Sequence, residues 1–214
     1  MKRMVSMFAV LLFVGGSLAY ADVIFTLGNN PQPDEYNILF GAAQSGATIT
    51  GEIAHSGILV NFMTLTGQTL YQNAKGQADI LSDPDQKDSA LTSLDITVPG
   101  YGFGDFIMNP LNGSGTALVT AIDNSEQAFT YDLGNGQNYL TITTSNGQFI
   151  TELKIEVTGG SFVQFKQPRI SDPCRLLGSD CEAIPPSQIP EPMSLLLLGT
   201  GLCGMGIAAW RRKK

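Results

Sequence analysis

The stretch FITELKIEV, residues 149–157, carries the clearest structural signal in the chain. Two sets of side chains alternate along it: apolar Phe149, Leu153, Ile155 and Val157 against charged Glu152, Lys154 and Glu156. A period of two is that of an extended chain with one face buried and the other in water. The sequence therefore predicts a half-buried β-strand here.

The same alternation recurs elsewhere in short runs, at residues 47–54, 93–98 and 129–133. Asn135-Gly136 and Asn146-Gly147 are strong turn dipeptides, so we expect hairpin turns on both sides of a strand over residues 138–144. Roughly ten to twelve short strands at this spacing are typical of an antiparallel β-sandwich, with little helix between the two chain ends. The predicted fold class is all-β.

The N-terminus has the three parts of a secretory signal peptide. Lys2-Arg3 supply positive charge, residues 4–16 are apolar, and Ala19-Tyr20-Ala21 is a site of the Ala-x-Ala type. We expect signal peptidase to remove residues 1–21, so that the mature chain begins at Asp22. A retained N-terminal anchor is the alternative.

The part between the two ends, residues 22–189, is strongly acidic. It holds six Lys or Arg and eighteen Asp or Glu residues, a net charge of −12. Nucleic acids and anionic membrane surfaces repel such a domain, so neither is an expected partner. Its 168 residues are enough for one domain with a sizeable core.

The C-terminus combines Pro190-Glu191-Pro192, an uncharged run at residues 193–210, and four cations: Arg211, Arg212, Lys213 and Lys214. As a helix, eighteen residues would span about 27 Å, close to the hydrocarbon thickness of a bilayer. Cations at the end of such a helix stay on the cytoplasmic side. The sequence predicts a transmembrane helix over residues 193–210 with a cytoplasmic basic tail at residues 211–214.

These three C-terminal parts together resemble the PEP-CTERM sorting signal of exported proteins in Gram-negative bacteria, here over residues 190–214. The resemblance implies an exosortase that cuts near Pro190-Glu191-Pro192. It also implies transient attachment to the inner membrane, delivery to the cell surface or extracellular matrix, and association with exopolysaccharide. An ordinary membrane anchor is the alternative interpretation.

The middle of the chain resembles small PEP-CTERM passenger domains. The matching segments are residues 60–62, 76–78, 106–109, 136–142 and 167–170. This resemblance implies a jelly-roll-like β-sandwich over residues 22–172 and indicates almost nothing about a ligand.

Cys174 and Cys181 lie seven residues apart in the exported part of the chain. An even pair in an oxidising compartment favours a disulfide over a metal pair. We expect this disulfide within an exposed tether, residues 173–189, which Pro185-Pro186 would stiffen.

No catalytic constellation is evident, and we predict no catalytic residue. His55, in a turn-like context, is the single histidine, and there is no Gly-x-Ser-x-Gly motif. Asp83, Asp85 and Asp88 could supply oxygens to a structural Ca²⁺, although Pro84 and Lys87 interrupt that loop. A solvated acidic turn is the favoured interpretation, and no other cofactor is expected.

Three functional hypotheses remain at this point. The first is a non-enzymatic surface or matrix protein, and the second is a carbohydrate-binding module. The third, ranked last, is a glycan-acting hydrolase or lyase that uses two carboxylates. Tyr101, Phe103 and Phe106 could form a sugar-stacking platform, but aromatic residues that lead into a strand favour the core instead.

Overall fold

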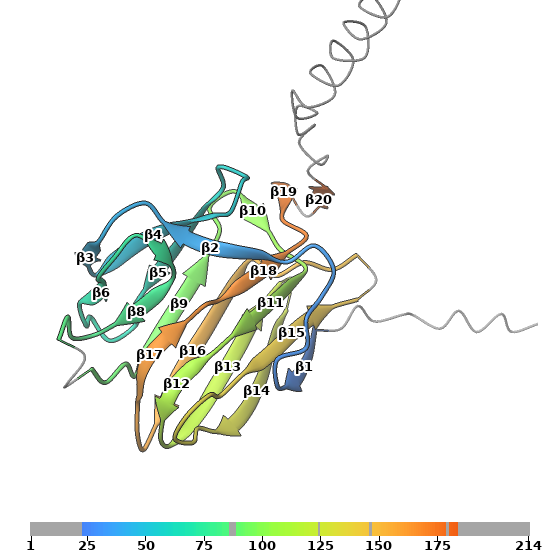
Figure 1. The fold of residues 1–214 in the computed structure, drawn as a ribbon. Helices are drawn as coiled ribbons and strands as arrows, with labels where there is room; N and C mark the ends of the chain where they lie inside the picture. The colour runs from blue at the N-terminus through green and yellow to red at the C-terminus, as the bar shows by residue number, and fades with distance from the viewer. Residues whose placement is uncertain (1–22, 86–88, 124, 146, 179, 184–214) are drawn as a thin grey trace, which may run out of the picture.

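The computed structural model describes residues 23–85, 89–123, 125–145, 147–178 and 180–183 (Figure 1). The predicted signal peptide and sorting signal, residues 1–21 and 190–214, lie outside these ranges. No helix in the described ranges has the length and apolar character needed to cross a bilayer. The predicted transmembrane helix at residues 193–210 therefore stays a prediction.

The described residues form twenty β-strands. They are β1 (Val23–Leu27), β2 (Tyr36–Phe40), β3 (Gln44–Gly46), β4 (Thr48–Ile53), β5 (Leu59–Met63), β6 (Leu70–Gln72), β7 (Gly76–Gln77), β8 (Asp79–Leu81), β9 (Ser93–Thr97), β10 (Tyr101–Gly102), β11 (Asp105–Met108), β12 (Pro110–Gly113), β13 (Thr116–Ile122), β14 (Glu126–Asp132), β15 (Leu140–Thr144), β16 (Glu152–Thr158), β17 (Phe162–Lys166), β18 (Arg169–Ser171), β19 (Cys174–Leu177) and β20 (Asp180–Ala183).

The largest sheet folds over on itself to make two layers. Its order is β1-β15-β11-β18-β2-β4-β5-β9-β16-β13-β14, with every pair antiparallel. In Figure 1, β9, β16, β13 and β14 lie behind β2, β18, β11 and β15. At the open edge, the rings of Phe25 on β1 and Phe129 on β14 stack with centroids 5.5 Å apart. The sheet is therefore nearly closed, and the predicted all-β antiparallel sandwich is confirmed at this level.

The front layer continues into a five-stranded sheet of order β12-β17-β8-β6-β3. Two backbone hydrogen bonds join the two sheets where the strands are interrupted. Lys166 N donates to Asn109 O at 3.0 Å, and Gln167 N donates to Ala78 O at 2.9 Å. Because such interruptions divide long strands into shorter ones, the structure has more strands than the ten to twelve predicted.

The core lies between the layers and is rich in phenylalanine. Six phenylalanine side chains are at most 1% exposed: Phe40, Phe62, Phe103, Phe106, Phe162 and Phe165. Fully burying such a side chain contributes roughly 1.5–3 kcal/mol relative to leaving it in water. The burial of these side chains therefore contributes to the stability of both layers.

The alternation predicted from residues 149–157 is confirmed in β16. Its apolar positions Leu153, Ile155 and Val157 are buried, and its charged side chains are partly or fully exposed. The strand begins at Glu152, and Ile150, rather than the predicted Phe149, is buried, in a bridge to Phe103. The strand at residues 47–54 is likewise confirmed, as β4.

The predicted hairpins on both sides of residues 138–144 are wrong. β15 pairs with β1 and β11, whereas β14 and β16 both pair with β13 in the other layer. Turn dipeptides fix a local reversal of the chain but not which layer the next strand joins. In this sandwich the chain crosses between layers at both places.

Strands β19 and β20 form a hairpin that pairs with β10 through β19. The predicted disulfide between Cys174 and Cys181 is confirmed, with Cα atoms 5.3 Å apart. Residues 174–177 and 180–183, expected to be part of a tether, are thus paired strands, while residues 184–189 lie outside the described ranges. A disulfide is typical of proteins outside the reducing cytosol.

Candidate functional site

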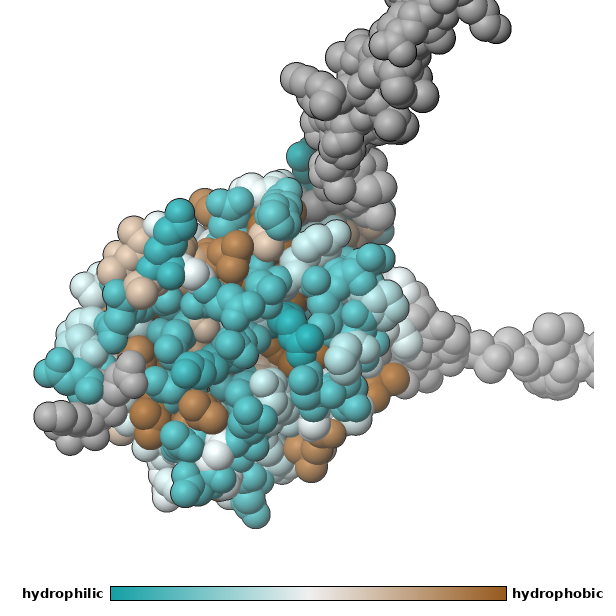
Figure 2. All heavy atoms as spheres, viewed as in Figure 1, coloured by the Kyte–Doolittle hydropathy of each residue, from teal (hydrophilic) through white to brown (hydrophobic). Residues whose placement is uncertain are grey.

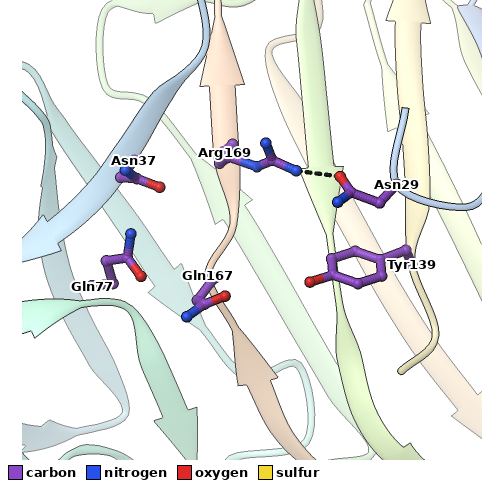
Figure 3. A pocket seen from close by; sticks show the side chains of 6 residues that line it. All are labelled: Asn29, Asn37, Gln77, Tyr139, Gln167 and Arg169. Atoms are coloured by element: carbon purple, nitrogen blue, oxygen red, sulfur yellow. Dashed lines mark hydrogen bonds between the residues drawn. The ribbon is translucent and has the colours of Figure 1, made fainter. Parts of the chain in front are cut away.

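A polar pocket of about 290 Å³ lies on the outer face of the front layer. Six residues line it: Asn29, Asn37, Gln77, Tyr139, Gln167 and Arg169 (Figure 3). The surface around it is mainly hydrophilic (Figure 2). Sequence analysis predicted none of these six as site residues.

Strand alternation aims two of these side chains outward. Asn37 on β2 lies opposite Arg169 on β18 in an antiparallel pair. Their chain neighbours Ile38 and Ile170 are fully buried in the core. Because successive side chains of a strand point to opposite faces, Asn37 and Arg169 must project from the outer face.

The interruption of the front sheet brings two glutamines together. Gln77 ends β7 and Gln167 lies between β17 and β18, with a φ of 50° in the left-handed region. The buried Ala78 links them, because its carbonyl accepts from Gln167 N at 2.9 Å and its N–H donates to Ile38 O at 3.0 Å. These backbone bonds set both side-chain amides beside Asn37.

Tyr139 faces these amides from across the pocket, with its hydroxyl directed toward Gln167 in Figure 3. It comes directly before β15, and the preceding Asn138 fixes the loop. Asn138 N donates to Asn109 Oδ1 at 3.0 Å, and Asn138 Nδ2 donates to Pro110 O at 2.8 Å. The tyrosine ring is therefore positioned by a hydrogen-bonded loop.

The segment between β1 and β2, residues 28–35, holds the guanidinium of Arg169. Arg169 Nη1 forms an ion pair with Glu35 Oε2 at 2.6 Å, and Arg169 Nη2 donates to Asn29 Oδ1. The Glu35 side chain is only 9% exposed, and its Oε1 accepts from Gln32 N at 2.6 Å. The one cation that lines the pocket is thus neutralised by a nearly buried carboxylate.

Other lining groups are left without such partners. In the described part of the chain, no protein group bonds to the side-chain amides of Asn37, Gln77 and Gln167 or to the hydroxyl of Tyr139. Each amide offers a carbonyl acceptor and two N–H donors. The pocket therefore presents several neutral donors and acceptors to whatever occupies it.

Among the described residues, no carboxylate, imidazole or thiol lines the pocket. Its only ionisable members are Tyr139 and Arg169, and it has no Asp, Glu, His or Cys. His55 lies exposed in the turn after β4, outside the lining. The described lining therefore offers hydrogen-bond donors and acceptors to a ligand.

A charged pair lies just beyond the glutamines. Asp79 on β8 pairs in register with Lys166 on β17, and Lys166 Nζ is 3.8 Å from Asp79 Oδ2. Burial raises the pKa of Asp79, and the nearby Lys166 charge opposes that rise. This second cation near the pocket also has a carboxylate partner.

The aromatic cluster considered in sequence analysis belongs to the core, as favoured there. Phe103 and Phe106 are fully buried with ring centroids 5.7 Å apart, and Tyr101 packs against the same core. They provide no sugar platform. The pocket's aromatic residue is Tyr139 instead.

The calcium prediction stays open. Asp85 N donates to Asp83 Oδ1 at 3.4 Å, and Asp88 lies outside the described residues. Across the ranges that are described, no three or more His, Cys, Asp or Glu side chains gather in a way that could hold a metal ion.

Three segments that were singled out in sequence analysis supply four of the six residues that line the pocket. Residues 76–78 contribute Gln77, residues 136–142 contribute Tyr139, and residues 167–170 contribute Gln167 and Arg169. The signal in the sequence was only local, namely polar side chains beside buried positions at strand ends, and it does not show that these segments meet.

No family model matches this chain. A search of curated proteins also finds no match. Among solved structures, a variant of a family 29 carbohydrate binding module has 7% identity and a TM-score of 0.31, covering 70% of this chain and 91% of that chain. A second variant has 9% identity and a TM-score of 0.31, covering 72% and 92%. These values do not place the chain in that family.

Proposed function

We propose that this protein is a non-enzymatic carbohydrate-binding protein and that the polar pocket binds a hydroxyl-rich sugar. The observation that carries the proposal is the convergence of Asn37, Gln77, Gln167 and Tyr139, whose side-chain polar groups have no protein partner in the described chain. Groups that converge without bonding one another are arranged for a ligand or for water.

Sugar chemistry suits these groups. Each sugar hydroxyl both donates and accepts, and a side-chain amide does the same with separate atoms. The ring of Tyr139 offers an apolar face to the C–H side of a sugar, and its hydroxyl offers a polar edge. Each new hydrogen bond replaces one to water, so it contributes only about 0.5–1.5 kcal/mol net. We therefore expect modest affinity at a single pocket.

The size of the pocket also bears on the ligand. Its volume of about 290 Å³ is at the lower end of the range of small-molecule pockets. A short segment of a glycan fits this volume better than a large cofactor. The lining has no pair of carboxylates, so nothing in the pocket supports the hydrolase or lyase alternative.

In the full proposal, the jelly-roll-like passenger binds exopolysaccharide at the cell surface or in the extracellular matrix. The N-terminal signal peptide would direct export, and an exosortase would process the chain near Pro190-Glu191-Pro192. The exported location is supported by the disulfide and by the two terminal sequence patterns.

A glycan array with the purified protein, with and without Ca²⁺, tests the binding proposal. We expect a defined set of bound glycans, whose affinities are then measured by calorimetry. Gln77→Ala should weaken binding about three- to tenfold because one amide is lost. Gln137→Ala, at an exposed glutamine outside the lining, is the matched control and should change nothing. Absence of any bound glycan, or equal effects of the two variants, would contradict the proposal.

A further inference from the structure

We infer that Glu35 determines the charge selectivity of the pocket, so that it binds neutral sugar residues and rejects acidic ones. This inference rests on the proposed carbohydrate-binding function. Glu35 does not line the pocket, and it acts through Arg169. It is therefore a specificity-determining residue behind the surface that a ligand would touch.

Arg169 is the only lining residue that could attract an anion. Arginine commonly binds carboxylates with two parallel N–H donors, and a uronic acid would need this contact. Here Glu35 accepts from Nη1 and Asn29 accepts from Nη2, so two of the five N–H donors of Arg169 are already engaged. An acidic sugar would therefore either displace Glu35 or bind the remaining donors beside the Glu35 carboxylate, whose like charge disfavours it.

Displacement of Glu35 would be costly because both of its carboxylate oxygens are engaged. Oε2 contacts Arg169 at 2.6 Å and Oε1 accepts from Gln32 N at 2.6 Å, while the side chain is only 9% exposed. Removing one partner of such a pair leaves an uncompensated charge away from water, which is strongly unfavourable.

Charges around the pocket act in the same direction. Lys166, the cation beside the glutamines, has Asp79 as its partner at 3.8 Å. The whole chain has a formal net charge of −7. This excess of negative charge repels polyanions over a distance, whereas it does not affect a neutral glycan. A neutral sugar can use the unpaired amides without disturbing the Arg169–Glu35 pair.

The test uses pairs of oligosaccharides matched in linkage and length, one neutral and one a uronate: β-1,4-glucan with glucuronan, and β-1,4-mannan with mannuronan. Calorimetry on the purified full chain should show at least about tenfold preference for the neutral member. Glu35→Gln keeps the shape of the side chain and removes its charge. We expect it to reduce that preference by about tenfold, with the gain in uronate binding falling as salt is added.

Glu52→Gln is the matched control. Glu52 is exposed, accepts a hydrogen bond from Gly57 N, and lies outside the pocket, so this variant changes the net charge equally. It should leave the preference unchanged. Thermal unfolding of both variants checks that they fold, and the preference of the unaltered chain is informative even if Glu35→Gln does not fold.

The outcomes separate this inference from the proposed function. If the unaltered chain binds no glycan, the proposed function fails. If it binds uronates as tightly as their neutral partners, or if Glu35→Gln changes the preference no more than Glu52→Gln, the role of Glu35 is overturned and glycan binding stands.

Discussion

The two layers differ in whether a nearly buried carboxylate has partners for its oxygen atoms. On the front layer, the nearly buried Glu35 has a cationic partner and a backbone donor. On the back layer, Asp95 in β9 is 6% exposed, and its Oδ1 has no hydrogen-bond partner. Burial, and then the neighbouring charge of Glu152, raise the pKa of Asp95 to about 6.

This difference shows why a perturbed pKa is an unreliable guide to the site in this protein. A strongly shifted carboxyl is usually a reason to look for function. Here Asp95 lies on β9 beside Glu152 and Lys154 of β16, and it does not line the pocket. The feature that identifies the pocket is a set of neutral side-chain amides without protein partners, and amides do not titrate.

The largest effect is expected from Arg169→Met. This change leaves Glu35 nearly buried without its cation, and it should lower the free energy of unfolding by about 2–3 kcal/mol. Urea unfolding measures it, with Arg175→Met at an exposed position of β19 as the control. Adding Glu35→Gln should recover part of the loss. Equal effects of the two arginine variants would show that the front pair does not stabilise the fold.

An intermediate effect of opposite sign is expected from Asp95→Asn. The folded chain holds the Asp95 proton up to a pKa of about 6, whereas the ordinary pKa of an aspartate is 3.8, so ionisation lowers stability as pH rises between these values. Asn avoids this loss and should stabilise the protein by roughly 1–2 kcal/mol at pH 7–8, after allowance for partial solvation. Little difference is expected below about pH 4. The same gain at both pH values would contradict this account.

The smallest effect is expected from Tyr139→Phe. The hydroxyl has no partner in the described chain, so stability should not change. Glycan affinity should fall about two- to fivefold because one hydrogen bond is lost while the ring remains. Tyr36→Phe, outside the pocket lining, is the control for calorimetric titration. A loss of stability without a loss of affinity would assign Tyr139 a structural role.

Sequence alone predicted the features that depend on local periodicity. The strand β16 follows from alternation along the chain, and the disulfide between Cys174 and Cys181 follows from an even cysteine pair in the part expected to be exported; both are confirmed. Strand β9 shows the limit of this reasoning. The alternation along residues 93–98 predicts that Asp95 faces water. In the structure Asp95 is 6% exposed, and it lies between Met63 and Lys154 on the two flanking strands.

The pocket could not be predicted because it depends on pairing between distant segments. Gln77 and Gln167 are ninety positions apart in the chain and meet only through the backbone of Ala78. Tyr139 joins them from a position just before β15, which the sequence predicted to lie within a strand between two hairpin turns. Register between strands decides which polar side chains share an outer face, and a single sequence does not specify that register.

Side-chain amide NMR during a glycan titration addresses the proposed binding site most directly. The NH₂ signals of Asn37, Gln77 and Gln167 should shift together as a neutral oligosaccharide is added. The NH₂ signal of Gln68, whose Nε2 already donates to Ala90 O at 2.8 Å, should not shift. Glycan binding that shifts Gln68 or other amides while the three pocket amides stay unchanged would contradict the proposed site.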